Sequence, residues 1–316
     1  MPSTSPSAIS RRSLIGTGLA TGASALALSA DPAAAEAETP FRYCLNMSTI
    51  RGQNLDAAQE IEVAAKAGYD AIEPWFKKID EYIAAGGKLA DLRKRIDDHG
   101  LIVASAIGFA NWIVDDDTER AAGLETAKKD MDTIAQLGGV RLAAPPAGAK
   151  GAIDLDRAAE RYRALLELGA KMGVAPQIEM WGPSPAIGTV EKALYIAIKA
   201  DHPMACFLGD TYHMYKGGCG IEGLRLMGPH ALQNFHMNDY PAEPVRAEIK
   251  DEHRVYPGDG VGKVVETLQI FREIGANPFL SLELFNKTYW AQPADLVAKT
   301  GLEKMKACVA KALTSA

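Results

Sequence analysis

Cysteine is scarce in this sequence, and the four cysteines form no familiar motif. None of Cys44, Cys206, Cys219 and Cys308 belongs to a C-x-x-C pair. This excludes a thioredoxin-like redox motif and a zinc site built on such pairs. Cys44 and Cys206 lie in apolar, strand-like runs, so we predict that both are small core residues. A disulfide bond stays open, because it depends on the redox state of the compartment.

An excess of positive charge is also absent, as are long apolar runs in most of the chain. The net charge is −6, so nothing in the composition indicates a nucleic-acid-binding surface. Beyond the N-terminal region no stretch approaches 18 apolar residues, so we expect no membrane span once that region is removed. The 316 residues suffice for one large domain or two small ones.

The N-terminal region has the features of an export signal. Arg11 and Arg12 precede a mildly apolar, Gly- and Ala-rich stretch at 14–28, and candidate A-x-A cleavage sites follow at 33–37. This pattern predicts a twin-arginine signal peptide and short linker over 1–37, and hence a periplasmic or other extracytoplasmic location. The alternatives are an ordinary secretory signal or a misassigned start site.

The remainder, 38–316, alternates regularly between apolar runs and amphipathic helical stretches. The apolar runs are 41–47, 69–75, 101–109, 140–146, 176–181, 204–210, 232–239 and 278–285. Several of the helical stretches end in glycine just before the next run, as a C-terminal cap would. Eight such units predict an α/β fold with a single (β/α)8 TIM barrel. An open doubly wound sheet is less consistent, because no G-x-G-x-x-G follows the first run.

Polar residues stand at the ends of several predicted strands. They are Glu73, Glu179, Asp210, His236 and Glu283, with His213 just beyond Asp210. In a TIM barrel the C-terminal ends of the strands meet at one face, where catalytic groups project. A charged group among apolar neighbours costs several kcal/mol unless it is paired or bound to a metal.

The last four predicted strand ends supply a candidate metal site. Its ligands would be Glu179, Asp210, His236 and Glu283. Three carboxylates and one imidazole favour six-coordinate Mn²⁺, with Mg²⁺ and Co²⁺ as alternatives. Each acid alone is more often part of an ion pair, but their convergence favours a metal. The histidines His99, His202 and His230 lie in turn contexts and are predicted to be exposed or structural.

These residues and their surroundings resemble a known family over about 41–316. The motifs are I-E at 178–179, D-T-Y-H-M at 210–214, F-H-M at 235–237, R-V-Y-P-G-D-G at 254–260 and L-E-L at 282–284. Together they are similar to the xylose isomerase-like barrel superfamily of sugar (phosphate) isomerases and epimerases. Within that superfamily the site pattern is nearest to the ketose 3-epimerases.

The resemblance implies roles for individual residues. It makes Glu179, Asp210, His236 and Glu283 the metal ligands and assigns Glu179 and Glu283 as the acid/base pair. The positions matching His213 and Arg254 would contact substrate oxygens. The implied partner is a small carbohydrate, and the family is often dimeric or tetrameric, although no interface is evident in the sequence.

The implied chemistry is movement of a proton at a carbon next to a carbonyl, through an enediolate. Reprotonation would make the protein a sugar isomerase or epimerase. Loss of a β-leaving group would instead make it a lyase or dehydratase on a keto-inositol or 3-keto-glycoside, and the sequence does not separate these outcomes. An AP endonuclease of the same superfamily would need histidines that 69–75 and 101–109 lack. A non-enzymatic sugar-binding barrel would be expected to lose an acid/base carboxylate.

The periphery of the site is less defined. Trp181, Trp112 and Phe109 stand at or after strand ends and are predicted to form an apolar wall or to pack in the core. Glu73 is expected either to touch a sugar hydroxyl or to form a structural ion pair. The P-G-D-G segment at 257–260 is interpreted as a tight turn, with phosphate binding at the following helix as the alternative.

Overall fold

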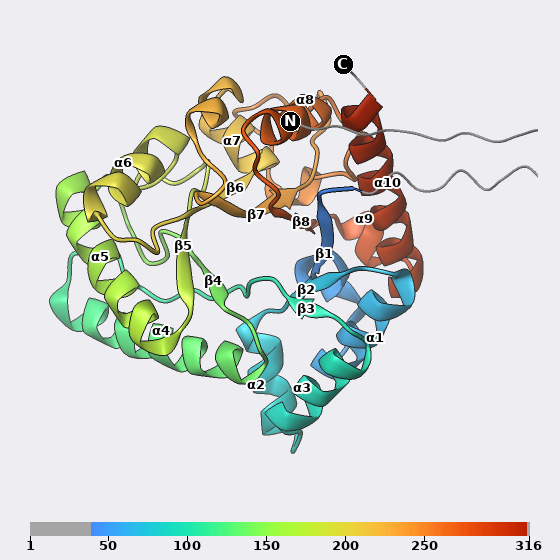
Figure 1. The fold of residues 1–316 in the computed structure, drawn as a ribbon, viewed down its shortest axis with the longest axis horizontal. Helices are drawn as coiled ribbons and strands as arrows, with labels where there is room; N and C mark the ends of the chain where they lie inside the picture. The colour runs from blue at the N-terminus through green and yellow to red at the C-terminus, as the bar shows by residue number, and fades with distance from the viewer. Residues whose placement is uncertain (1–38, 315–316) are drawn as a thin grey trace, which may run out of the picture. The chain divides into compact units, whose positions relative to one another are not determined.

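The computed structural model describes residues 39–314. The predicted export signal at 1–37 lies outside the described residues. Eight strands follow one another along the chain, with helices between them (Figure 1). The strands are β1 (Arg42–Asn46), β2 (Ala71–Glu73), β3 (Ile102–Val103), β4 (Arg141–Ala144), β5 (Ala175–Glu179), β6 (Phe207–Asp210), β7 (Leu232–Met237) and β8 (Phe279–Leu282). Seven of them fall within the predicted apolar runs, and β5 begins one residue before the run at 176–181.

The strands form one parallel sheet that curls into a barrel. Their order is β3-β2-β1-β8-β7-β6-β5-β4, and every ladder is parallel. The gap between the first and last strand of this order is bridged where Ala143 N–H donates to Ala106 O at 2.9 Å. This arrangement confirms the predicted (β/α)8 barrel, in which the C-terminal ends of all strands face the same way.

Helices surround the strands in Figure 1. The elements are η1 (Met47–Gln53), α1 (Ala57–Ala67), α2 (Phe76–Ala84), α3 (Leu89–Asp98), α4 (Asp117–Gln136), α5 (Leu155–Met172), α6 (Val190–Ala200), α7 (Thr211–Gly217), η2 (Glu222–Leu226), η3 (Asp251–His253), α8 (Val264–Glu273), α9 (Lys287–Trp290) and α10 (Ala294–Thr314). Two of the predicted glycine ends are left-handed caps, Gly68 after α1 (φ 90°) and Gly173 after α5 (φ 71°). Only glycine adopts this conformation without strain.

The core contains two of the cysteines and one of the tryptophans singled out in the sequence. Cys44 and Cys206 are buried as predicted, and all four cysteines of the described chain are free thiols. Trp112 is only 1% exposed, and its indole N–H donates to Pro145 O at 2.8 Å. Of the two alternatives for Trp112, an apolar wall or core packing, the structure shows core packing, with its ring against Tyr162. Among residues 39–314 no helix is both long and apolar enough to cross a bilayer.

The long connection after β7 is closed at its base. Asp239 and Val255 form an antiparallel bridge, with Asp239 N–H donating to Val255 O (3.0 Å) and Val255 N–H donating to Asp239 O (2.9 Å). Residues 240–254 therefore leave the barrel and return to the same point.

The Asp239 side chain also organises the P-G-D-G turn. Its carboxylate accepts hydrogen bonds from the backbone N–H groups of Gly258, Gly260 and Gly262, at 2.8–3.2 Å. A Cβ at Gly260 would lie 2.2 Å from Tyr240 O, so the close approach requires glycine. These amides already hold an anionic group of the protein itself, which supports the turn interpretation over phosphate binding.

Candidate active site

A cavity of about 590 Å³ opens among the loops that follow the strand C-termini. Its lining includes Glu179, His213, Arg254, Glu283, Trp181 and Phe109. Five of these were predicted to be site residues, and the cavity brings them together. The other three predicted residues, Glu73, Asp210 and His236, are fully buried beside it. The size suits a small-molecule ligand rather than a macromolecule.

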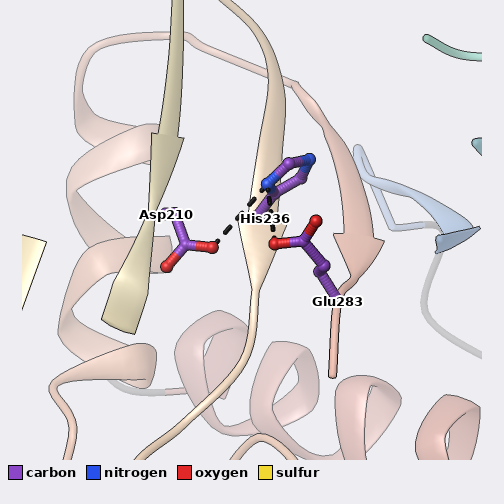
Figure 2. Close-up of side chains that lie close together, drawn as sticks. All are labelled: Asp210, His236 and Glu283. Carbon is purple, nitrogen blue, oxygen red and sulfur yellow. Dashed lines mark ion pairs between the residues drawn. The ribbon is translucent and has the colours of Figure 1, made fainter. Parts of the chain in front are cut away.

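Three side chains converge as a candidate metal site. The ligand atoms of Asp210, His236 and Glu283 lie within 4.8 Å of one another. His236 Nδ1 is 3.2 Å from Glu283 Oε2 and 3.7 Å from Asp210 Oδ2, and Figure 2 shows both carboxylates pointing toward this nitrogen. The sheet register accounts for the convergence, because Asp210 at the end of β6 stands directly beside His236 of β7.

The fourth predicted ligand, Glu179, is slightly farther away. Its Oε1 lies 3.9 Å from His236 Nδ1, which leaves it facing the same point from β5. Burial raises the pKa of Glu179 to about 8; the nearby His236 opposes the rise, and Glu283 adds to it. Burial therefore favours the protonated form of this carboxyl.

The residues fit a divalent cation on a second, independent observation. His236 Nδ1 is buried and has no hydrogen-bond partner among the described residues, although its other ring nitrogen does. His236 Nε2 lies 3.1 Å from Glu73 Oε2, so the carboxylate keeps the proton on Nε2 and leaves the Nδ1 lone pair free when the ring is neutral. A metal-binding histidine commonly donates its other N–H to a carboxylate in this way.

His236 does not stay neutral without a cation. Burial alone would lower its pKa, but the carboxylates of Glu283 and Glu73 raise it well above the ordinary value. A cation at this site would therefore displace a proton from the imidazole, and binding would strengthen as pH rises.

Glu73 lies behind His236 and does not line the cavity. One of its oxygens, Oε2, accepts hydrogen bonds from Asn46 Nδ2 (2.9 Å), His236 Nε2 (3.1 Å) and Ser281 Oγ (2.6 Å). Burial would raise the pKa of Glu73, but the His236 charge and these donors lower it. This position favours the structural ion pair over the predicted contact with a sugar hydroxyl.

Arg254 joins the candidate ligands to the cavity. Its guanidinium Nη1 donates to Asp210 Oδ2 (2.9 Å) and Glu283 Oε2 (2.7 Å), and Nη2 lies 3.1 Å from His213 Nε2. Burial would raise the pKa of Asp210, but the charge of Arg254 lowers it well below its usual range. Nη2 also donates to Asp251. Arg254 thus forms ion pairs with three acids and also lines the cavity.

Aromatic rings form one wall of the cavity. Trp75 lies against Phe109 with ring centroids 5.4 Å apart, and Phe109 lies 6.1 Å from Trp181. Phe285 continues the wall, 6.0 Å from Trp75. The sequence interpretation missed Trp75 and Phe285, although Trp75 is the last residue of a predicted strand and Phe285 closes another, where their positions could have drawn notice.

Comparison with known proteins places this barrel in a family. The model of the xylose isomerase-like TIM barrel matches residues 61–308. An inosose isomerase of Bacillus velezensis is 28% identical over 279 residues, covering 86% of this chain and 98% of that protein. A crystal structure of IolI protein with a bound zinc atom has a TM-score of 0.80 at 23% identity, covering 87% of this chain and 100% of the other. D-psicose 3-epimerase, solved in the presence of D-fructose, has a TM-score of 0.69 at 19% identity, covering 85% and 99%. The family match spans most of the chain and agrees with the fold and the predicted motifs: the chain belongs to the xylose isomerase-like TIM barrel family.

Proposed function

We propose that this protein is a sugar isomerase or epimerase that depends on a divalent metal and moves a proton at a carbon next to a carbonyl. The observation that carries the proposal is the placement of Glu179 and Glu283. Both carboxyl groups line the cavity and both face His236 Nδ1, from opposite ends of the β5–β8 series. The inosose isomerase relatives and the epimerase with the same fold support this reaction class.

The two carboxyl groups perform complementary tasks. One takes the proton from the carbon next to the carbonyl, and the electron pair moves toward the carbonyl oxygen to give an enediolate. The other returns a proton to the same carbon for epimerisation. For isomerisation, the hydroxyl proton of that carbon passes to the former carbonyl oxygen, and the returned proton goes to the former carbonyl carbon. Glu179, whose pKa is raised by burial, is suited to proton transfer near neutral pH.

Arg254 and His213 position the substrate oxygens. The Arg254 side chain lines the cavity while its Nη atoms are held by carboxylates and His213, so it would present positive charge to a hydroxyl or carbonyl oxygen of the substrate. Burial lowers the pKa of His213, which keeps this ring neutral at pH 7. The aromatic wall formed by Trp75, Phe109, Trp181 and Phe285 would pack against the apolar face of the sugar and exclude water.

The proposed metal is Mn²⁺, with Mg²⁺ and Co²⁺ as alternatives. Asp210, His236, Glu283 and Glu179 would hold it, and a set of mainly oxygen donors suits these ions. When bound, the cation supplies Lewis-acid stabilisation of negative charge on the substrate oxygens. Elemental analysis of the purified protein tests the identity, and a stoichiometric zinc content would favour the ion seen in the IolI structure instead.

The test of the reaction is proton exchange in D₂O, followed by NMR. The Mg²⁺-loaded protein would be incubated with free ketoses, keto-inositols and 3-keto-glucosides, and with Glu179→Gln as the control protein. Deuterium at the carbon next to the carbonyl, with a new sugar of the same formula apart from the label, would support the proposal. Loss of water or of an aglycone would replace isomerase by lyase. No exchange with any member would overturn the proposed chemistry.

A further inference from the structure

The cations of the cavity differ in how they are paired. Arg254 is neutralised by the three carboxylates described above, and Lys287 forms an ion pair with Glu252. Within residues 39–314, the side chains of Arg51 and Lys250 have no ion pair with a carboxylate, although both line the cavity. Lys250 is exposed to water, whereas Arg51 is half-buried. Of these two unpaired cations, Arg51 is therefore the one that is less stabilised by contact with water.

Arg51 is held among aromatic rings. It lies in η1, directly after β1, with Cζ 5.1 Å from the Trp75 ring centroid, 5.2 Å from that of Phe285 and 4.9 Å from that of Trp290. Rings against a guanidinium plane contribute cation–π attraction but accept no N–H hydrogen bonds. No acceptor for the side-chain N–H groups of Arg51 lies within hydrogen-bond distance in the described chain, so their donors remain free for a ligand.

The cage around Arg51 is itself fixed. The Trp75 indole N–H donates to Asn46 Oδ1 and the Trp290 indole N–H to Ser48 O, both at 2.9 Å. A Cβ at Gly52 would lie only 2.2 Å from Trp290 Cβ, so this glycine lets the ring close over the segment that carries Arg51. The guanidinium is thus pre-organised, which reduces the entropy lost when it binds a partner.

Arg51 also lies close to the reacting groups. Arg51 and Glu283 line the same cavity, and the Glu283 carboxylate opposes the lowering of the Arg51 pKa by burial. Arginine keeps its proton throughout the physiological range. A group bound to Arg51 would therefore belong to the same small molecule whose carbon faces Glu283.

We propose that Arg51 binds a carboxylate of the substrate, which makes the substrate an acidic keto-sugar rather than a neutral one. A carboxylate accepts two parallel hydrogen bonds from the planar edge of a guanidinium and also neutralises its charge. A pair of hydroxyls can accept hydrogen bonds but leaves the charge unpaired. This proposal rests on the proposed function for the part of the substrate that reacts, the carbon next to the carbonyl. What it adds is the carboxylate on the substrate and Arg51 as the residue that binds it.

The test is calorimetric binding to the metal-loaded full chain. The ligands would be D-fructuronate and 2-keto-D-gluconate, which carry a carboxylate at opposite ends, and D-fructose as the neutral counterpart. We expect at least one acid to bind roughly ten- to hundredfold more tightly than D-fructose. Arg51→Gln should remove this preference, measured as the ratio of the affinity for the acid to the affinity for D-fructose. The matched control is Arg42→Gln, since Arg42 of β1 also stacks on a ring, Phe279 at 4.9 Å, but does not line the cavity.

Several outcomes would overturn the inference. They are equal affinity of the wild-type protein for D-fructose and both acids, a preference that survives in Arg51→Gln, and absence of acid binding at millimolar concentration. Deuterium exchange separates this result from the proposed function. Arg51-dependent binding of an acid without deuterium exchange would support the role of Arg51 and refute the proposed isomerase activity. Deuterium exchange on D-fructose without any preference for acids would support the activity and refute the role of Arg51.

Discussion

Replacing Glu73 by glutamine separates a role in holding the metal from a role in holding the sugar. Glu73 carries a buried negative charge, and its Oε2 is the acceptor for His236 Nε2–H. In Glu73→Gln the amide oxygen can still accept that hydrogen bond, but the charge that makes the imidazole a better donor of its lone pair is lost. We therefore expect weaker metal binding with little change in the cavity itself.

The magnitude follows from the contact of Glu73 with the ring nitrogen of His236 that would not bind the metal. Loss of a carboxylate behind a ligating histidine lowers metal affinity by roughly 10- to 100-fold, which corresponds to about 1.4–2.8 kcal/mol. Because glutamine keeps an acceptor for His236 and for Ser281, the expected effect lies near the lower bound. Ser281→Ala is the matched control: it removes one neutral donor to Oε2 and keeps the carboxylate beside the imidazole, so metal affinity should stay close to wild type.

The assay is calorimetric titration of the metal-free protein with Mn²⁺, alongside KM for the best substrate found by deuterium exchange. A thermal unfolding curve for each variant confirms that the barrel is folded. An unchanged metal Kd together with a raised KM in Glu73→Gln would refute the reasoning and return Glu73 to the substrate contact predicted from the sequence.

Three further predictions address catalysis, stability and export. Glu179→Gln and Glu283→Gln should each lower kcat by roughly 10²–10⁴-fold without unfolding the barrel, measured by deuterium exchange, and full activity in either would remove it from the acid/base pair. Glu60 of α1 is 2% exposed, and burial raises its pKa to about 8, against the small opposing effect of Lys78. Since the folded state holds this proton more tightly than the unfolded state, its stabilising effect is complete below pH 4.5 and is lost as pH rises to about 8. Guanidinium unfolding at pH 5–8 should therefore show a decline in stability with pH that Glu60→Gln flattens, and identical slopes would contradict the assignment. Replacing Arg11 and Arg12 by lysine should retain the protein in the cytoplasm when cell fractions are compared, and unchanged export would exclude the twin-arginine route.

The fold and the polar core of the site follow closely from sequence patterns. Apolar runs separated by amphipathic helices specify a parallel barrel, and parallel strands must bring their C-terminal ends to one face. A residue such as Glu179 or His236 at a strand end is therefore placed by backbone topology alone. This is why the convergence of Asp210, His236 and Glu283 can be expected from the sequence.

Side-chain partners are harder to predict, because they depend on packing between segments far apart in the chain. Glu73 at the end of β2 turns toward His236 of β7, a contact across the barrel interior that no local pattern encodes. Trp112 and Trp75 both follow strand ends, yet one packs in the core and the other lines the cavity. Arg51 acquires its setting from Trp290, 239 positions away along the chain, and so gave no signal in sequence.

The bridge between Asp239 and Val255 has a consequence for how this barrel can diversify. Because the connection is pinned at both ends, Arg254 is delivered to the site by the base of the loop rather than by its excursion. Residues 241–248 are exposed or only partly buried, so substitutions of their side chains would alter the rim near Lys250 while the guanidinium that meets Asp210 stays in place. Changes in this loop would therefore alter which substrates fit at the rim, while the contacts of Arg254 with Asp210 and Glu283 beneath it stay the same.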